Sequence, residues 1–206
     1  MGELFLNKGI IVLSEKDGEI DPFTERSKRI NLAIAKTASK LVEDNSKVFV
    51  NSSRLALLTV SQMYKKQITF LSNNIRLSSI PHNNKSVLLL SGGEIREPKE
   101  ILVGDYASSF FRNIIVDYSV IGIAGISPIN GLTTPIYQES IINRIMIENT
   151  RKKVIIVGDF SRIGKISNFK TADLKKIGCL VTDQYANPTL IKEIRKIGIE
   201  VVQAII

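Results

Sequence analysis

Short apolar runs rich in Val, Ile and Leu recur along the chain, and most are separated by segments with helical periodicity. Most of the runs are continuous rather than alternating, which is typical of strands that are covered on both faces. The sheet that they form is therefore expected to lie inside the protein. We predict strands at residues 47–51, 67–71, 86–90, 118–124, 154–157, 179–182 and 199–202.

Five segments between these runs have the pattern of amphipathic helices. The clearest covers residues 26–42, where Ile30, Ile34 and Ala38 recur on one side at helical spacing. The other predicted helices are residues 55–64, 106–111, 135–149 and 188–197. Strands that alternate with helices pair in parallel through right-handed crossovers. The pattern predicts an α/β fold, an open and mostly parallel sheet with helices on both faces.

The composition is that of one globular domain. The chain has 206 residues, of which 44% are hydrophobic and 23% are charged, so it can bury a core and is too apolar for wholesale disorder. No apolar run reaches the roughly 18 residues of a membrane-spanning helix. The N-terminal residues lack the basic-then-apolar pattern of a signal peptide. We therefore expect a cytoplasmic protein without membrane contact.

The sequence offers little for metal or thiol chemistry. Its one cysteine, Cys179, lies in an apolar run and is expected to be a buried structural thiol. One histidine, His82, together with this cysteine makes no credible zinc cluster. We expect neither a metal nor another cofactor.

The formal net charge of +8 raises the question of nucleic-acid binding. The basic residues are spread through the chain, they are not interleaved with aromatic residues, and the chain has no tryptophan. Most of these basic residues are explained by positions at helix ends or on solvent-exposed surface. The positive field is expected to favour an anionic small ligand or to assist a tethered DNA-binding head.

Polar segments follow the predicted strands, at the edge of a parallel sheet where ligands usually bind. After the first strand come Asn51, Ser52, Ser53 and Arg54. Small hydroxyl side chains and backbone N–H groups at a helix start hold a phosphate, and Arg54 offers a charge-assisted clamp. An ordinary helix cap by Asn51 or Ser52 is the alternative, and it is favoured when this segment is taken alone.

Similar polar residues follow five further strands. The amides after the second strand suit sugar hydroxyls but also cap helices, and the glycines after the third and fourth allow close backbone approach but also form plain turns. Each segment alone has an ordinary explanation, yet six polar strand ends in one sheet predict a ligand crevice. The candidate residues are Ser72, Asn73, Asn74, Gly92, Gly93, Glu94, Gly125, Asp159, Ser161, Arg162 and Lys165, and Thr182 and Asp183 close the sixth strand.

The order of these segments resembles the effector-sensing domain of DeoR-type bacterial transcriptional repressors, over nearly the whole chain. The most specific part is an Asp-x-Ser-Lys/Arg-x-Gly segment followed by a Thr-Asp pair, here at residues 159–164 and 182–183. Other matching landmarks are residues 22–26, 34–35, 72–74, 92–93, 104, 122–131 and 139.

The resemblance implies a fold similar to ribose-5-phosphate isomerase and to CoA-transferase-like proteins. It implies a repressor of sugar-metabolism genes that releases DNA when a phosphorylated sugar binds, and we expect a homo-oligomer. Two positions depart from the family pattern. Residues 51–54 lack the glycine and threonines usual after the first strand, so the phosphate contact is rebuilt around Arg54 or the effector differs. Arg162 stands where lysine is common, and its planar fork binds phosphate bidentately.

The winged helix-turn-helix head usual in such repressors has no counterpart in this sequence. We expect residues 1–20 to be an irregular linker that follows this head, and residues 21–206 to be the effector-sensing domain. DNA is then contacted only through the head. The chain is either an excised fragment or a naturally headless protein.

The rival hypothesis is a sugar-phosphate isomerase-like enzyme of the same fold. Such an enzyme needs a carboxylate base, and the loop where ribose-5-phosphate isomerases carry acidic residues here contains Ala124 and Gly125. Glu139 and Asp159 remain as candidate bases, and we expect no enzyme activity. A pure interaction module is the third class, and it would need no polar crevice.

The effector-binding hypothesis assigns three tasks. Backbone N–H groups near Ser52 and Ser53, with Arg54, hold the phosphate. Sugar hydroxyls are bound by Asn73, Glu94 and Asp159, and the far side of the anion is covered by Arg162 or Lys165. Binding then shifts the placement of subunits, because the ligand favours one of two arrangements.

Overall fold

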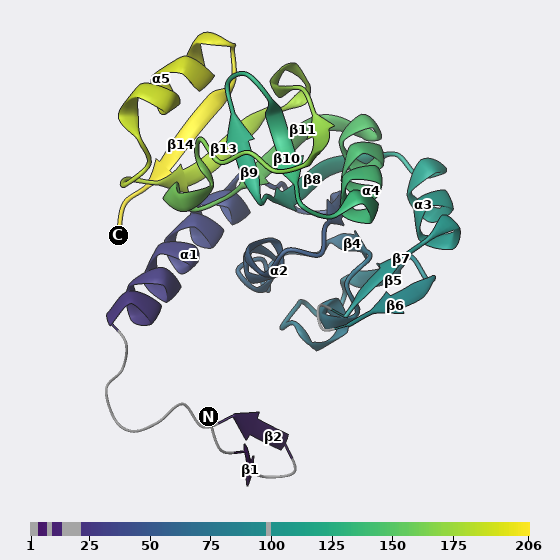
Figure 1. The fold of residues 1–206 in the computed structure, drawn as a ribbon. Coiled ribbons are helices and arrows are strands. Elements are labelled where there is room, and N and C mark those ends of the chain that lie inside the picture. The colour runs from purple at the N-terminus through teal and green to yellow at the C-terminus, as the bar shows by residue number, and fades with distance from the viewer. Residues whose placement is uncertain (1–3, 8–9, 14–21, 98–99) are drawn as a thin grey trace.

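A seven-stranded sheet forms the centre of the protein (Figure 1). The computed structural model describes residues 4–7, 10–13, 22–97 and 100–206. Every pair of neighbouring strands in this sheet is parallel, so the predicted α/β sheet is confirmed. Its strands are β3 (Lys47–Val50), β4 (Thr69–Ser72), β5 (Val87–Leu90), β8 (Val116–Gly122), β11 (Thr150–Val157), β13 (Cys179–Asp183) and β14 (Glu200–Ala204).

The strand order is β14-β13-β11-β8-β3-β4-β5. From β3 the chain builds outward through β4 to β5, and it then returns to place β8 on the other side of β3. From β8 it builds outward in the opposite direction. The carboxyl ends of β3 and β8 are therefore neighbours from which the chain leaves in opposite directions, with Val50 beside Val120. Such a switch point is where open α/β sheets usually bind ligands.

Helices cover both faces of the sheet, as predicted (Figure 1). On one face lie α1 (Pro22–Lys40) and α2 (Arg54–Ser61), and on the other lie α3 (Asp105–Arg112), α4 (Tyr137–Glu148) and α5 (Pro188–Lys196). Because strand side chains alternate, Val120 packs with the first group and Ile121 with the second. Burial on both faces explains why the strands read as continuous apolar runs.

All seven predicted strands and all five predicted helices correspond to elements of the structure, with ends shifted by a few residues. α1 begins at Pro22 and ends at Lys40, and β8 ends at Gly122. Asn187 caps α5 by accepting hydrogen bonds from the backbone N–H groups of Thr189 and Leu190. Cys179 is buried, as predicted.

Three small antiparallel sheets were not predicted from the sequence. One contains β9 (Gly125–Ser127), β10 (Gly131–Thr134) and β12 (Phe169–Ala172), and a second pairs β6 (Glu94–Arg96) with β7 (Ile101–Val103). The third pairs β1 (Leu4–Asn7) with β2 (Ile10–Leu13), within the segment predicted as a linker. The remaining residues of that segment, 1–3, 8–9 and 14–20, lie outside the described residues, so the linker stays a prediction.

Candidate functional site

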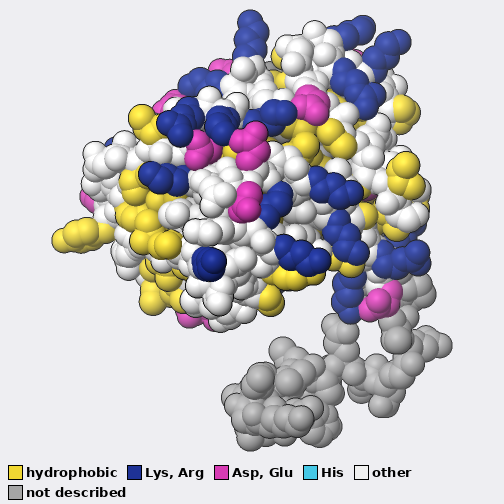
Figure 2. Space-filling view, turned by 180° about the vertical axis from the view of Figure 1, so that it is seen from behind, with side chains coloured by type: hydrophobic (Ala, Val, Ile, Leu, Met, Phe, Trp, Pro, Cys, Tyr) yellow, Lys and Arg dark blue, Asp and Glu magenta, His cyan; other side chains and the backbone are white. Residues whose placement is uncertain are grey.

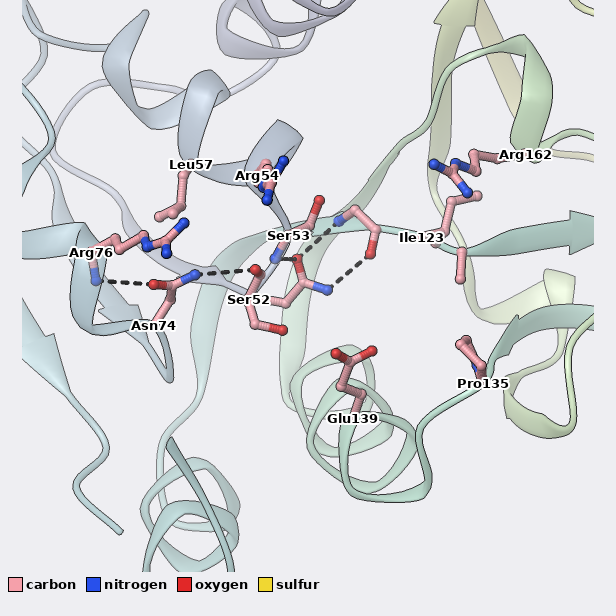
Figure 3. Close-up of a pocket in the computed structure, with 13 residues that line it drawn as sticks. Ser52, Ser53, Arg54, Leu57, Asn74, Arg76, Ile123, Pro135, Glu139 and Arg162 are labelled. Carbon is pink, nitrogen blue, oxygen red and sulfur yellow. Dashed lines mark hydrogen bonds between the residues drawn. The ribbon is translucent and has the colours of Figure 1, made fainter. Parts of the chain in front are cut away.

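A cavity of about 440 Å³ lies at the switch point between β3 and β8 (Figure 3). Its size is that of a small-molecule site. The lining comes from the segments that follow β3, β4, β8, β10 and β11, and from α4. The lining residues are Asn51, Ser52, Ser53, Arg54, Leu57, Asn74, Arg76, Gly122, Ile123, Ala124, Pro135, Glu139 and Arg162.

Asn51 holds the floor of the cavity together. Its side chain accepts a hydrogen bond from the Gly122 N–H at 3.0 Å and donates to the Gly122 carbonyl at 2.9 Å. It also donates to Oδ1 of Asn143 on α4 at 3.2 Å and accepts from the Ser53 N–H at 3.3 Å. The amide thus takes the place of the next β3 peptide group, where the chain has already turned away from β8. Because both ends of this buried amide are engaged, Asn51 positions the site.

The N-terminus of α2 opens onto the cavity. Ser53 is the N-cap, and its Oγ accepts a hydrogen bond from the Leu55 N–H at 3.2 Å. The capping role considered for Asn51 or Ser52 therefore belongs to Ser53. A Cβ at position 122 would collide with the Ser53 side chain, so glycine allows the helix to approach β8 this closely. A helix N-terminus carries a partial positive charge that favours anions.

Three arginines and one carboxylate line the cavity. Arg76 lies in the 3₁₀ helix η1 (Ile75–Ser79) and pairs through Nε with Glu100 at 2.6 Å. Arg162 lies in η2 (Phe160–Arg162), with Nε 3.9 Å from Oδ2 of Asp159. Glu139 accepts a hydrogen bond from the Thr134 hydroxyl at 2.9 Å. The charged side chains of the lining are therefore predominantly cationic.

Asn74 joins the two loops on the β3 and β4 side of the cavity. Its Nδ2 donates to the Ser52 carbonyl at 3.1 Å, and its Oδ1 accepts from the Arg76 N–H at 2.9 Å (Figure 3). The loop that carries Arg54 and the turn that carries Arg76 are thus held in a fixed relation.

Six of the predicted site residues line this cavity. They are Asn51, Ser52, Ser53, Arg54, Asn74 and Arg162. Two others, Ser72 and Asn73, are buried outside the lining. The Ser72 hydroxyl accepts from the Asn74 N–H at 3.0 Å, and Nδ2 of Asn73 donates to the Leu102 carbonyl at 3.1 Å. These two side chains therefore hold the loop that carries Asn74.

Five more predicted residues lie away from the cavity. Gly92 and Gly93 precede β6, both with positive φ, and Glu94 lies in β6 itself, paired with Arg96 at 2.9 Å. Gly125 packs against the backbone of Lys165, and Lys165 is exposed. The sequence places these residues after predicted strands, but it does not show the path of the loop that follows each strand. It therefore could not show that these residues lie away from the cavity.

The last two predicted residues, Asp159 and Ser161, line a second cavity of about 150 Å³ that adjoins the first. Arg162 lines both cavities, and residues of α1 form the opposite wall of the second one. Oδ1 of Asp159 accepts hydrogen bonds from the Ser161 N–H at 2.9 Å and from its hydroxyl at 2.5 Å. Asp159 is therefore the cap of η2.

Sequence reasoning did not assign several lining residues to the effector site. Glu139 was considered as a landmark of the resemblance and as a candidate catalytic base, and Arg76 was not considered. The sequence did offer a reason to include Arg76 in the site, since it lies two residues after the candidate Asn74. The unassigned lining residues are Leu57, Arg76, Gly122, Ile123, Ala124, Pro135 and Glu139.

Basic side chains are also spread over the outer surface, with acidic side chains between them on the face shown in Figure 2. Some form ion pairs between elements, such as Lys152 with Glu43 at 2.6 Å and Lys153 with Glu200 at 3.0 Å. In the part of the chain that the structure describes, no helix is long and apolar enough to cross a membrane. The described residues also hold no group of three metal-ligating side chains among His, Cys, Asp and Glu.

A family model described as the DeoR C-terminal sensor domain matches residues 27–184. The chain belongs to this family. This DeoR sensor domain is 24% identical over 197 residues to the HTH-type transcriptional repressor GlcR of Bacillus subtilis (strain 168), covering 94% of this chain and 76% of that relative. It is 29% identical over 175 residues to the HTH-type transcriptional regulator GlpR of Haloferax volcanii, covering 84% of this chain and 68% of that relative.

Among solved structures, the DeoR sensor domain is similar to ribose 5-phosphate isomerase A from Methanocaldococcus jannaschii. The TM-score is 0.47 with 13% identity, over 66% of this chain and 54% of that chain. It thus spans about half the length of that isomerase chain. The matched family is one of sensor domains and the named relatives are transcriptional regulators, so the chain is a regulatory domain rather than an enzyme.

Proposed function

We propose that this domain binds a phosphorylated sugar in the cavity between β3 and β8 and so controls a repressor of sugar-metabolism genes. The observation that carries the proposal is a cavity at the switch point of the sheet, lined by three arginines and by the start of α2. We further propose that residues 21–206 are the effector-sensing domain of a homo-oligomer, and that DNA is bound by a winged helix-turn-helix head.

The phosphate binds where α2 begins. The positive end of the α2 dipole and the guanidinium of Arg54 supply positive charge at one place, and the guanidinium also supplies donors. Arg54 is exposed, and no side-chain partner is seen for it among the described residues. It therefore gives up no protein contact when it turns to an anion.

The sugar hydroxyls bind at the centre of the cavity. Glu139 and Ser52 line this part, and both offer acceptors for hydroxyl groups. They take the task that the sequence analysis assigned to Asn73, Glu94 and Asp159, which lie outside the lining of this cavity. Glu139 is a ligand-binding residue in this proposal.

Arg162 links the effector to α1. It lines the effector cavity and also the adjoining cavity, whose other wall includes Ser27 and Asn31 of α1. Its contact with Asp159, at 3.9 Å, is too long for a hydrogen bond. A ligand anion that draws Arg162 toward the effector cavity changes the wall on which α1 rests. Binding then favours one placement of α1, and of the subunits, over another.

The test is binding of sugar phosphates, the matching free sugars and inorganic phosphate, measured by thermal shift and isothermal titration calorimetry. A ligand of the folded state raises the melting temperature by mass action. We expect a selective rise with a sugar phosphate. We also expect Arg54→Ala to weaken its binding by roughly tenfold or more, since one charge-assisted contact is worth about 1.5–3 kcal/mol.

Arg112→Ala is the matched control, because Arg112 is an exposed arginine on α3 outside the cavity. It should bind the same ligand as tightly as the wild type. If no phosphorylated sugar binds, or if Arg54→Ala and Arg112→Ala bind equally well, the phosphate site at α2 is wrong.

A further inference from the structure

We infer that the effector carries two anionic groups, one at each end of a hydroxylated chain. The inference rests on the proposed function and names the class of ligand. It is a sugar bisphosphate or a phosphorylated sugar acid, rather than a sugar with a single phosphate. The structural basis is that positive charge comes from two opposite sides of the cavity with a carboxylate between them.

The two sides are set by the strand order. Arg54 follows β3 and Arg162 belongs to the segment that follows β11, and β8 lies between these two strands. Neighbouring strands are about 4.8 Å apart, so the strand ends that lead to these arginines are separated by roughly 10 Å. Arg76, after β4, lies one strand further from Arg162. Figure 3 shows Arg54 and Arg76 on one side of the cavity and Arg162 on the other.

A single phosphate at α2 leaves the opposite side without an anion. Charge-assisted hydrogen bonds require about 2.7–2.9 Å between donor and acceptor. The separation of the strand ends places Arg162 beside a different part of the ligand than Arg54. Arg162 makes a long ion-pair contact, rather than a hydrogen bond, with its neighbour: Nε lies 3.9 Å from Oδ2 of Asp159, while Oδ1 of Asp159 accepts both hydrogen bonds from Ser161. The guanidinium is therefore positioned for a second anionic group.

A carboxylate disfavours an anion in the middle of the cavity. Glu139 comes from α4 and, in Figure 3, its carboxylate points into the space between the two sides. A carboxylate accepts hydrogen bonds from hydroxyl groups and repels a phosphate. The lining therefore fits a ligand that carries an anionic group, then hydroxyl groups, and then a second anionic group. A polyol with an anionic group at each end has this arrangement.

The test compares three probes on the same protein by isothermal titration calorimetry: fructose 6-phosphate, fructose 1,6-bisphosphate and 6-phosphogluconate. We expect at least one doubly anionic probe to bind tenfold or more tightly than fructose 6-phosphate, since a second charge-assisted contact adds about 1.5–3 kcal/mol. Preference for the bisphosphate or for the sugar acid identifies the second group as phosphate or carboxylate, and either result supports the inference.

Arg162→Gln separates the two anionic groups. It should remove the preference for the doubly anionic probe, because the second anionic group loses its partner, and it should weaken the doubly anionic probe more than fructose 6-phosphate. Arg54→Gln should weaken both probes, and Arg112→Gln should weaken neither. Melting temperatures of the ligand-free variants show whether each one is folded.

Two results overturn the inference, and they differ in what they say of the proposed function. If the monophosphate binds as tightly as both doubly anionic probes, and Arg162→Gln changes neither affinity, the effector has one anionic group and the sugar-phosphate site stands. If none of the three probes nor any other phosphorylated sugar binds, the inference fails together with the proposed function.

Discussion

Replacing Asn51 with alanine should destabilise the fold at the point where the site is built. The residue is 3% exposed, and its side chain makes four hydrogen bonds, two of them to the backbone of Gly122. Alanine removes all four and leaves the Gly122 N–H, the Gly122 carbonyl, the Ser53 N–H and Oδ1 of Asn143 without these partners. A buried polar group that loses its partner costs about 1–3 kcal/mol. Allowing for water that enters from the adjoining cavity, we expect a loss of about 3 kcal/mol.

Urea unfolding followed by far-UV circular dichroism measures this loss. A drop of about 3 kcal/mol lowers the midpoint by about 1 M at an unchanged m value, and it lowers the melting temperature by roughly 10 °C for a chain of this length. Asn51→Asp should be at least as destabilising at pH 7, because it keeps the size of the side chain but removes both donors and buries a charge. Asn168→Ala, at an exposed loop position, is the control and should change stability by less than about 0.5 kcal/mol.

A loss below about 1 kcal/mol for Asn51→Ala would refute the reasoning, since the amide would then not be replacing a peptide group of the sheet. A changed m value would point instead to a different unfolded or native state. Binding of the effector should weaken together with stability in this variant, because Asn51 fixes the distance between the two strand ends.

Four further predictions concern Gly122, Cys179 and Asp117. Gly122→Ala should cost about 2 kcal/mol in urea unfolding because its Cβ collides with the N-cap of α2, and a wild-type midpoint would contradict this. Burial raises the pKa of the Cys179 thiol to about 11, so a thiol reagent at pH 8 should label it only after unfolding. Because the native state holds the thiol proton more tightly than the unfolded state, the contribution of Cys179 to the free energy of unfolding should fall as pH rises from 9 to 11. Burial raises the pKa of Asp117, but hydrogen bonds from the Lys47 backbone and Arg151 outweigh it and hold the pKa below 3.8. Asp117→Asn should therefore lose about 1 kcal/mol at pH 7, and the difference from wild type should shrink below pH 4, as acid titrations of stability would show.

The alternation of apolar runs and helices was sufficient to predict the central sheet and its helices. Strand side chains such as Val120 and Ile121 face opposite cores, so both must be apolar, and that requirement is visible in sequence. The small antiparallel sheets were not visible. Strands of three or four residues, such as β6 and β9, are too short for a period to appear, and their pairing depends on where the surrounding loops lie.

The sequence by itself determined the fold class, the family and the loop that begins at Asn51, because these depend on local order along the chain. Only the tertiary structure decided which strand ends share a cavity. Gly125 and Lys165 follow strands as Arg54 does, yet they do not line it. Glu139 comes from a helix and enters it. The physical reason is that a ligand site is made by strand order, here β3 beside β8, and neighbours in a sheet need not be neighbours in sequence.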